Sequence, residues 1–293
     1  MKKKIWITGS NGQLGRAMEK EFETQSVFNG CDIYRTDVAE GGPIHALDIR
    51  DIEGVIGFAR EWKPDIVINC AAYTAVDEQE ENGDLAYQIN ALGPRNLSIA
   101  AAETGAALVH ISTDYVFRGD GNRPYVEFDP TGPVSMYGRT KLAGENFVKD
   151  FARRYFILRT AWLYGDGKNF VKTMLKLSEN HDEVSVVSDQ LGTPTSAAEL
   201  ARAITALIQT ENYGLFHATC EGDTNWADFA ERIFELAQKN TRVRHVTTAE
   251  YEKINPKSTK RPAYSILDNY MLRLTDSYRF AHWEDALKEY LAR

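Results

Sequence analysis

The chain has 293 residues, of which 43% are hydrophobic and 26% are charged. This is an ordinary globular composition, and the length allows one large or two modest domains. The formal net charge of −8 argues against a nucleic-acid-binding protein. An anionic ligand must therefore be held by local devices, such as helix N-termini and single basic side chains.

Targeting signals and cysteine spacing indicate the cellular compartment in which the protein is expected. The basic start 2–4 resembles a signal peptide, but the apolar run behind it stops at Thr8, and no other segment approaches the length that crosses a bilayer. The cysteines are widely spaced and offer neither zinc spacing nor an evident disulfide framework. They are Cys31, Cys70 and Cys220. We expect a cytoplasmic protein with neither a membrane nor a nucleic acid as partner.

The first predicted strand, 5–7, runs directly into three glycines at equal spacing. Apolar residues recur every four positions from Leu14 onward, so the glycines lie where a strand meets an amphipathic helix. Such a junction attracts phosphate through free N–H groups and the helix dipole. We interpret Gly9 as the tight turn, Gly12 as the close approach to a pyrophosphate and Gly15 as the contact between helix and strand. The spacing differs from G-x-G-x-x-G, and an ordinary glycine-rich turn is the alternative.

The second predicted strand, 31–37, carries a hint about a dinucleotide. It ends in Asp37, 22 residues beyond Gly15, where an acid would accept hydrogen bonds from an adenosine ribose. Arg35 favours the opposite choice, because an arginine can accommodate the 2′-phosphate of NADP. A solvated aspartate in a turn is the alternative for Asp37, and Asp48 either faces the adenine or caps a helix.

Strands and helices then alternate along the chain. Compact apolar runs predict buried parallel strands, and helical stretches lie between them. The strands are expected at 65–72, 107–113 and 155–164, with helices at 85–103, broken at Pro94, and at 135–152. Repeated units of this kind predict a doubly wound sheet that binds ligands at the carboxyl ends of its strands.

Beyond residue 165 the pattern loosens. The expected elements are helices at 170–180, 197–209 and 226–239, the last capped by Thr224, strands at 184–187 and 215–219, and a final helix ending at Arg293. We therefore predict an α/β protein with a Rossmann-like, doubly wound parallel sheet and a smaller mixed α/β C-terminal substrate lobe. Residues 1–165 would form the dinucleotide-binding domain, completed by a segment near 183–212, and 166–293 would mainly form the interleaved substrate lobe.

Candidate chemistry lies in "STDYVF" (112–117) and "YGRTK" (137–141). Tyr137 and Lys141 are four residues apart on a predicted helix, so their side chains leave the same face. A neighbouring ammonium would favour the ionised phenol and lower its pKa. Thr113 ends a strand, where its hydroxyl could hold a substrate carbonyl against Tyr137. Each residue alone is common by chance, and only their conjunction points to acid–base chemistry.

These residues resemble the extended short-chain dehydrogenase/reductase family. The resemblance is carried by "TGSNGQLG" (8–15), "NCAA" (69–72), Thr113 and Tyr137-x-x-x-Lys141. More narrowly, the chain is similar to the dTDP-4-dehydrorhamnose reductases within that family, over about residues 4–293. The motifs with this narrower similarity are "STDYVF", "YGRTKLAGE", "RTAWLYG", "KNFVKTML", "SDQLGTPT" and "RPAYSILD".

The resemblance implies NADPH or NADH as cofactor and a nucleotide sugar, dTDP-4-dehydro-L-rhamnose, as the ketone that is reduced. Tyr137 would donate the proton, Lys141 would bind the nicotinamide ribose and tune the tyrosine, and Thr113 would position the keto group. Cofactor contacts are expected from Gly9, Asn11, Gly12, Gln13, Leu14, Gly15, Asp37, Asp48, Ala71, Ala72, Tyr137 and Lys141. Substrate contacts are expected from Thr113, Tyr115, Trp162, Asn169, Gln190 and Arg261.

Several of these assignments have plainer alternatives. Ala71 and Ala72 could serve tight packing alone, and Trp162 and Tyr115 could be core aromatics. Arg261 suits a diphosphate, but a solvated surface arginine is its alternative. Lys172 could help to bind the same diphosphate.

Three rival functions follow from the same resemblance. Sugar-nucleotide 4,6-dehydratases place an Asp-Glu pair after the catalytic threonine, whereas here Asp114 is followed by Tyr115, which disfavours dehydration. A 4-epimerase is a weaker alternative. The non-catalytic regulatory subunit of methionine adenosyltransferase is a related binding module, which the intact Thr113, Tyr137 and Lys141 disfavour. We expect a monomer or homodimer and predict no metal site.

Overall fold

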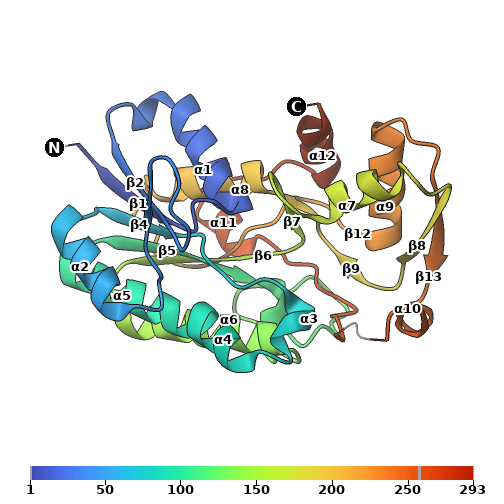
Figure 1. Cartoon of the computed structure of the whole chain (residues 1–293), viewed down its shortest axis with the longest axis horizontal. Coiled ribbons are helices and arrows are strands. Elements are labelled where there is room, and N and C mark those ends of the chain that lie inside the picture. Colours follow the sequence, from blue (N-terminus) through green and yellow to red (C-terminus); the bar gives the residue numbers. More distant parts are fainter. Residues whose placement is uncertain (1, 257–258, 293) are drawn as a thin grey trace.

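The computed structural model describes residues 2–256 and 259–292. Its centre is a sheet of seven strands in the order β11-β6-β5-β4-β1-β2-β3, and every pair of neighbours is parallel (Figure 1). The strands are β1 (Lys4–Thr8), β2 (Asp32–Asp37), β3 (Ile44–Ala46), β4 (Ile66–Asn69), β5 (Ala107–Thr113), β6 (Tyr155–Thr160) and β11 (Gly214–His217). The chain reverses its direction of winding between β1 and β4, so a crevice opens beyond their carboxyl ends.

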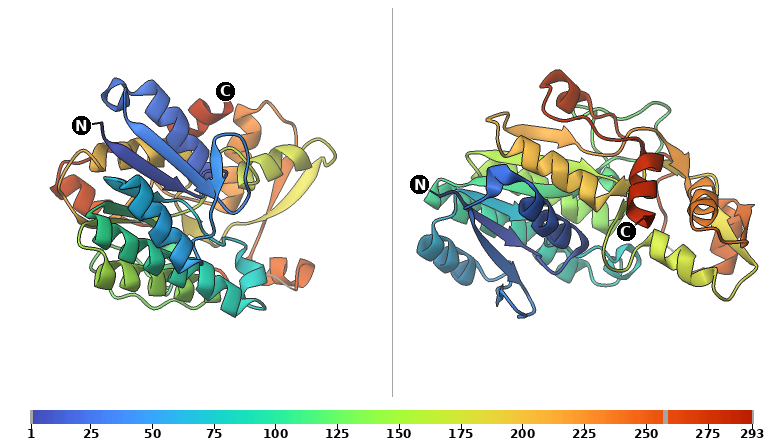
Figure 2. Two further views of the ribbon diagram at one scale, coloured as in Figure 1. Left: turned by 60° about the vertical axis from the view of Figure 1, so that its left-hand side comes forward. Right: turned by 90° about the horizontal axis from the view of Figure 1, so that it is seen from above.

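Helices cover both faces of the sheet. On one face lie α2 (Ile52–Trp62), α4 (Gly83–Tyr87), α5 (Gly93–Thr104) and α6 (Met136–Phe151), and on the other lie α1 (Gln13–Thr24) and α8 (Ala197–Leu207) (Figures 1 and 2). The central strand β1 shows why both faces are needed, because Ile5, Trp6 and Ile7 are all fully buried. The stripe predicted from Leu14 onward is the buried side of α1. Burial of these apolar side chains stabilises the layered arrangement.

A smaller lobe lies beyond the carboxyl ends of the strands (Figure 1). It contains β8 (Glu183–Val187) paired in parallel with β13 (Arg242–Val246), and the helices α7 (Phe170–Leu177), α9 (Trp226–Leu236) and α10 (Thr248–Ile254). Two short pairs join it to the rest, namely β7 (Leu163–Tyr164) with β10 (Thr195–Ser196) and β9 (Leu191–Gly192) with β12 (Thr224–Asn225). The remaining α-helices of the described residues are α3 (Val76–Gln79), α11 (Tyr270–Leu274) and α12 (Trp283–Leu291).

The predicted α/β fold with a doubly wound parallel sheet is confirmed. The exact division into two domains stays a prediction, because the chain returns from the lobe to the sheet through α8 and β11. None of the helices in the described part of the chain is both long and apolar enough to span a membrane.

The break expected at Pro94 is present: α5 begins at Gly93 with Pro94 in its first turn, where the missing N–H costs nothing, and a π-helical turn at Gln88–Leu92 precedes it. Two other local predictions were wrong. The N-cap of α9 is Asn225 rather than Thr224, since its side chain accepts from the Asp228 N–H at 2.9 Å. The strand expected at 155–164 is divided into β6 and β7. The last helix, α12, ends at Leu291, and Arg293 lies outside the described residues.

Candidate active site

The glycine loop packs directly against the end of β4. Gly9 has φ +68°, and a Cβ there would lie 2.5 Å from the Ala71 nitrogen. A Cβ on Gly15 would lie 2.5 Å from the Gly9 carbonyl oxygen. Gly12 is the N-cap of α1 and has no side chain to occupy the first turn. The loop therefore exposes backbone at a helix N-terminus, as a pyrophosphate site requires.

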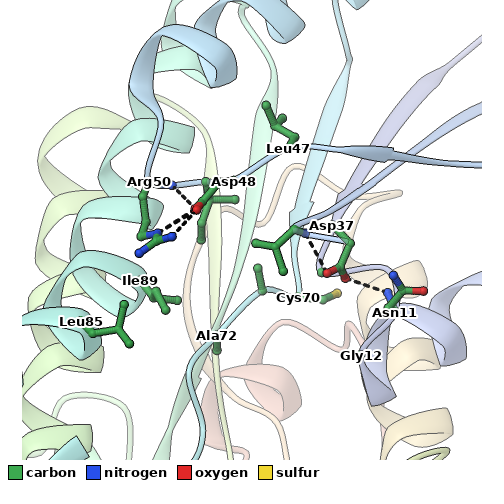
Figure 3. Close-up of a pocket in the computed structure, with 14 residues that line it drawn as sticks. Asn11, Gly12, Asp37, Leu47, Asp48, Arg50, Cys70, Ala72, Leu85 and Ile89 are labelled. Atoms are coloured by element: carbon green, nitrogen blue, oxygen red, sulfur yellow. Dashed lines mark hydrogen bonds and ion pairs between the residues drawn. The ribbon is translucent and has the colours of Figure 1, made fainter. Parts of the chain in front are cut away.

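A cleft of about 720 Å³ opens beside this loop. Figure 3 shows Asn11 and Asp37 on one side of it and Asp48 and Arg50 on the other, with Ala72 between them. Its walls are Gly9, Asn11, Gly12, Asp37, Val38, Leu47, Asp48, Ile49, Arg50, Cys70, Ala71, Ala72, Leu85 and Ile89. Apolar walls with a few polar groups at the rim are typical of small-molecule sites.

The polar rim of the cleft distinguishes between Asp37 and Arg35, the two residues of β2 that favoured different coenzymes. Asp37 lines the cleft and accepts from the Asn11 N–H at 3.0 Å and from the Val38 N–H at 2.8 Å. Arg35 instead forms an ion pair with Glu19 of α1 and is not among the residues that line the cleft. The nearby arginine in the cleft is one that the sequence analysis missed.

That arginine is Arg50, whose Nε donates to Asp48 Oδ2 at 2.8 Å. The hydrogen bonds from Arg50 hold the pKa of Asp48 below its usual value. Asp48 therefore carries an ion-paired carboxylate on the wall of the cleft. In the sequence, only the position of Asp48 after a short apolar stretch indicated that it could lie at the cofactor site. No motif spacing indicated Arg50.

A second cavity continues from the first, since Gly12, Cys70, Ala71 and Ala72 line both. It contains most of the residues that the sequence analysis singled out, brought together from β5, α6 and the lobe. Its walls include Gln13, Leu14, Thr113, Asp114, Tyr115, Tyr137, Lys141, Trp162, Lys168, Asn169, Phe170, Trp226 and Arg261.

Tyr137 and Thr113 form the polar centre of this cavity. The Tyr137 hydroxyl faces the Thr113 side chain, and desolvation raises the pKa of the phenol above its ordinary value. The Tyr115 ring meets the Tyr137 ring edge-on, with centroids 5.3 Å apart. The expectation that Lys141 lowers the pKa of Tyr137 does not hold in this structure. The phenol is protonated at neutral pH, the state that a proton donor needs.

Lys141 is buried and points toward the end of the sheet. Its Nζ donates to the Ile111 carbonyl oxygen at 2.5 Å, and burial lowers its pKa to about 8. One turn later on the same helix, the fully buried Glu145 accepts from Arg159 Nε and Nη2, both at 2.8 Å. Ser112 donates to Glu145 at 2.6 Å. This buried network fixes α6 against β5 and β6.

The far wall of the cavity is aromatic. Trp162 stacks on Trp226 with ring centroids 3.5 Å apart and planes at 11°, and Phe170 lies 4.6 Å from Trp226. Trp162 has φ +47°, a strained conformation for a bulky residue. A Cβ on Gly192 would lie 2.5 Å from the Trp162 ring, so this glycine makes room for it. Trp226 and Phe170 were missed because they lie in amphipathic helices, where aromatic residues are ordinarily core.

A third pocket adjoins the aromatic wall through Phe170, Trp226 and Arg261. It is lined by Asp77, Phe170, Met174, Ser185, Val186, Val187, Gln190, Trp226, Thr248, Tyr251, Glu252, Asn255, Thr259 and Arg261. Gln190 is held there by a hydrogen bond from its Nε2 to Thr248 Oγ1 at 3.0 Å. Arg261 is anchored at the junction, since Nη2 lies 3.1 Å from Asp77 Oδ2.

Asn169 and Lys172 differ from the other expected substrate residues. Asn169 lines the second cavity, but it also caps α7, accepting from the Lys172 N–H at 3.0 Å and donating to the Gly165 carbonyl at 2.6 Å. Lys172 is not among the residues that line the three pockets, whereas Lys168 lines the second. Lys168 was missed because an isolated lysine in a turn carries no distinguishing pattern.

One group of possible metal ligands lies close together in the described part of the chain. Asp228, Glu231 and His245 place ligand atoms within 4.8 Å of one another, but all three are exposed on the lobe. None of them lines the three pockets. His245 Nε2 lies 2.8 Å from Glu231, an ordinary surface contact. The three cysteines are free.

Comparison with known proteins gives matches along the whole chain. The family model described as the RmlD substrate binding domain matches residues 3–293. A dTDP-4-dehydrorhamnose reductase from Streptomyces griseus is 40% identical over 97% of this chain and 91% of its own length.

Solved structures agree with the sequence matches. A dTDP-4-dehydrorhamnose reductase from Clostridium acetobutylicum is 51% identical, has a TM-score of 0.92, and the match covers 99% of this chain and 98% of that one. A dTDP-4-dehydrorhamnose reductase from Bacillus anthracis, solved in complex with NADP, is 42% identical with a TM-score of 0.91, over 100% of this chain and 99% of that one.

Proposed function

The chain belongs to the RmlD substrate-binding-domain family, and we propose that, like the dTDP-4-dehydrorhamnose reductases to which it is similar, it reduces the C4 ketone of dTDP-4-dehydro-L-rhamnose. The product is dTDP-L-rhamnose, a nucleotide-activated deoxysugar of the kind used for surface polysaccharides. The protein is an oxidoreductase that uses NADPH or NADH.

The first cleft fits the adenosine and pyrophosphate of such a cofactor. Gly9, Gly12 and Gly15 leave backbone exposed where any side chain would collide with Ala71 or the loop itself. Asp37 and Arg50 stand at opposite sides of the cleft, where an adenosine ribose would lie between them. The nicotinamide end, which supplies a hydride when the cofactor is bound, would reach the second cavity past Ala71 and Ala72.

The observation that carries the proposal is the Thr113–Tyr137 hydroxyl pair where the cofactor cleft meets the substrate cavity. Thr113 holds the carbonyl oxygen, and the Tyr137 Oη–H bond breaks as its proton passes to that oxygen. The raised pKa of Tyr137 supports this role, because the proton is still present at neutral pH. Lys141 would hold the ribose hydroxyls of the bound cofactor beside the phenol.

The residue after Asp114 separates reduction from elimination. Dehydration needs an additional base to remove a proton from the sugar, and Tyr115 occupies the position where a dehydratase has glutamate. Burial raises the pKa of the Tyr115 phenol to about 12, so it keeps its proton at neutral pH and is a structural part of the cavity rather than a base. Ketone reduction needs only a hydride and a proton, which this set of residues accommodates.

The third pocket takes the nucleotide end of the substrate. Arg261 stands between the two pockets, where its guanidinium meets the diphosphate with charge-assisted hydrogen bonds. Val186, Tyr251 and Gln190 then surround the base with apolar surface and one amide. Trp162 flanks the sugar. A free sugar without its nucleotide is a poor substrate, because the remote binding energy is lost.

Turnover of dTDP-4-dehydro-L-rhamnose tests the proposal. Each reduced coenzyme is supplied in turn, its absorbance is followed, and the product is identified by mass spectrometry. A gain of two hydrogens with matching coenzyme consumption supports the reductase. Loss of water identifies a dehydratase, an unchanged mass with a new sugar configuration identifies an epimerase, and binding without any conversion identifies a regulatory module.

A further inference from the structure

Asp114 is an acid that the proposed reaction leaves without a role. It follows Thr113 at the end of β5, is only 3% exposed, and lines the substrate cavity. Its Oδ1 lies 2.9 Å from Thr113 Oγ1, and the Ser265 hydroxyl faces the same carboxyl group. Ser265 itself donates to the Leu191 carbonyl at 3.2 Å. A buried carboxyl group in direct contact with the substrate-holding hydroxyl affects which way that hydroxyl points.

The hydrogen bonds around Thr113 make this effect explicit. A threonine hydroxyl has one hydrogen to donate and two lone pairs that accept. Thr113 Oγ1 accepts from the Tyr115 N–H at 3.2 Å, lies 2.9 Å from Asp114 Oδ1, and faces the Tyr137 hydroxyl. When Asp114 and Tyr137 both bond to this oxygen, one of the two bonds uses the hydrogen of Thr113 and the other uses its second lone pair.

An ionised Asp114 turns the hydroxyls away from the substrate. A carboxylate only accepts, so Thr113 must donate to Asp114. The second lone pair of Thr113 then receives the Tyr137 O–H, and the proton that Tyr137 should give to the substrate is directed at Thr113 instead. In this state neither hydroxyl offers a hydrogen to a carbonyl oxygen in the cavity.

A neutral Asp114 reverses both bonds. Its carboxyl O–H donates to Thr113, which fills the second lone pair and frees the Thr113 hydrogen to point at Tyr137 Oη or at the substrate oxygen. The Tyr137 O–H is no longer needed by Thr113 and points into the cavity. Both hydroxyl hydrogens are then available to a carbonyl oxygen.

We propose that Asp114 is a positioning residue whose neutral carboxyl group directs the hydroxyl hydrogens of Thr113 and Tyr137 toward the carbonyl of the substrate. This inference rests on the proposed reductase function and assigns the direction of the hydrogen bonds at its centre. Asp114 acts through Thr113 and does not itself transfer the proton to the sugar.

The surroundings of Asp114 favour the neutral form. Burial raises its pKa to about 7, against the opposing hydrogen bond from Thr113. The titratable groups that share its cavity come from several segments: they are Cys70 after β4, Tyr115 on the same turn, Tyr137 and Lys141 on α6, Lys168 before α7, and Arg261. A carboxyl with a raised pKa is neutral below that pKa and ionised above it, so the competent arrangement is lost as the pH rises through about 7.

The test is the pH dependence of single-turnover ketone reduction. For the wild type we expect the rate to fall by up to about tenfold per pH unit above the midpoint, well below the pH at which Tyr137 ionises. Asp114→Asn supplies an amide N–H₂ that donates to Thr113 at every pH, so we expect it to lose this fall. The matched control is Glu127→Gln, which removes another buried carboxyl of raised pKa outside the cavity lining and should keep the wild-type midpoint.

Each outcome decides between the alternatives. A wild type that reduces the ketone, with a fall that Asp114→Asn retains or Glu127→Gln also abolishes, overturns the role of Asp114 but leaves the reductase function intact. A wild type that reduces nothing at any pH overturns the reductase function itself. If Asp114→Asn does not fold, carbon-13 NMR of the wild type labelled at its aspartate carboxyls decides. The proposal requires one carboxyl that titrates at the kinetic midpoint, and its absence contradicts the proposal.

Discussion

The cofactor cleft and the substrate cavity share a wall but are built by different means. The cleft depends on one continuous loop, in which Gly9, Gly12 and Gly15 expose backbone against the end of β4. The aromatic wall of the cavity depends on side chains from separate segments, where Trp162 after β6 stacks on Trp226 of α9. Backbone at a helix N-terminus suits any pyrophosphate, whereas side chains assembled from distant segments distinguish one substrate from another.

The difference also appears in where strain is located. In the cleft, the left-handed conformation falls on Gly9, which adopts it without steric cost. In the cavity it falls on Trp162, at φ +47°, where it costs on the order of 1–3 kcal/mol. Stacking on Trp226 and the space left by Gly192 hold the ring in that position. The substrate end is thus the part in which stability is given up for a specific arrangement.

Replacing Tyr137 should produce the largest effect, because it acts where the two regions meet. Tyr137→Phe removes the hydroxyl but keeps the ring that packs against Tyr115. We expect single-turnover reduction to slow by about two to four orders of magnitude, the range for loss of a general acid. The dissociation constants of coenzyme and nucleotide sugar, measured by fluorescence titration, should change little. A variant that keeps most of its rate would remove Tyr137 from the chemistry.

The glycine loop of the cofactor cleft can be disrupted by a substitution that leaves the substrate cavity unchanged. Gly15→Ala places a methyl group 2.5 Å from the Gly9 carbonyl oxygen, and the surrounding atoms are all backbone. Overpacking of about 1–3 kcal/mol should raise the coenzyme dissociation constant by roughly ten- to a hundredfold. The nucleotide sugar should still bind with nearly its original affinity, since its own pocket is unchanged.

Gly57→Ala is the matched control for this variant. Gly57 lies in the interior of α2, and a Cβ there would meet no atom within 4 Å. We expect unchanged coenzyme affinity and a gain in unfolding free energy of about 0.5–1 kcal/mol from helix propensity. Equal coenzyme affinity in Gly15→Ala and Gly57→Ala would contradict the role of the glycine loop in binding the coenzyme.

The contrast between the two regions explains how far the sequence could be read. The glycine loop and Thr113 could be recognised locally, because each directly follows the apolar run of a strand in the sequence. Strand β5 was predicted with its actual bounds, since a run of buried apolar residues followed by polar ones marks a strand that ends at the rim of a sheet. Side-chain walls assembled from distant segments have no such local pattern, and Trp226 and Arg50 were missed for that reason.

Lys141 shows the remaining limit. Spacing of four residues correctly indicated that Tyr137 and Lys141 share a face of α6, but it did not determine where the ammonium points. A buried ammonium needs an acceptor, and the Ile111 carbonyl provides one at 2.5 Å. The pKa of Tyr137 is therefore set by burial rather than by its neighbour's charge. Only the packing of α6 on β5 could show this.

At the substrate end, Arg261 tests whether the cavity and third pocket bind one ligand. Arg261→Ala removes the guanidinium between them, and loss of charge-assisted hydrogen bonds worth about 1.5–2 kcal/mol should raise KM for the nucleotide sugar by roughly ten- to thirtyfold. The dissociation constant of the coenzyme should not change.

Arg123→Ala provides the comparison for Arg261. Arg123 also pairs with an aspartate, Asp129, at 2.7 Å, but it does not line any of the three pockets. The Arg123→Ala variant should therefore keep the wild-type KM for the nucleotide sugar. A similar rise in both variants would mean that a change in net charge, rather than contact with the diphosphate, weakens substrate binding.

The smallest effect is expected at the rim of the cofactor cleft, where side chains rather than backbone distinguish NADH from NADPH. Asp37→Ala removes a carboxylate that would accept bonds from a free ribose hydroxyl and repel a 2′-phosphate. At about 4 Å in water that repulsion is worth about 1 kcal/mol, so the ratio of NADPH to NADH affinity should rise roughly fivefold. Isothermal titration with each coenzyme measures this ratio. Arg35→Ala is the matched control, because Arg35 pairs with Glu19 and does not line the cleft, and its ratio should stay at the wild-type value. If Arg35→Ala weakened NADPH while Asp37→Ala left the ratio unchanged, Arg35 rather than Asp37 would set coenzyme choice, and the geometry of this rim would need revision.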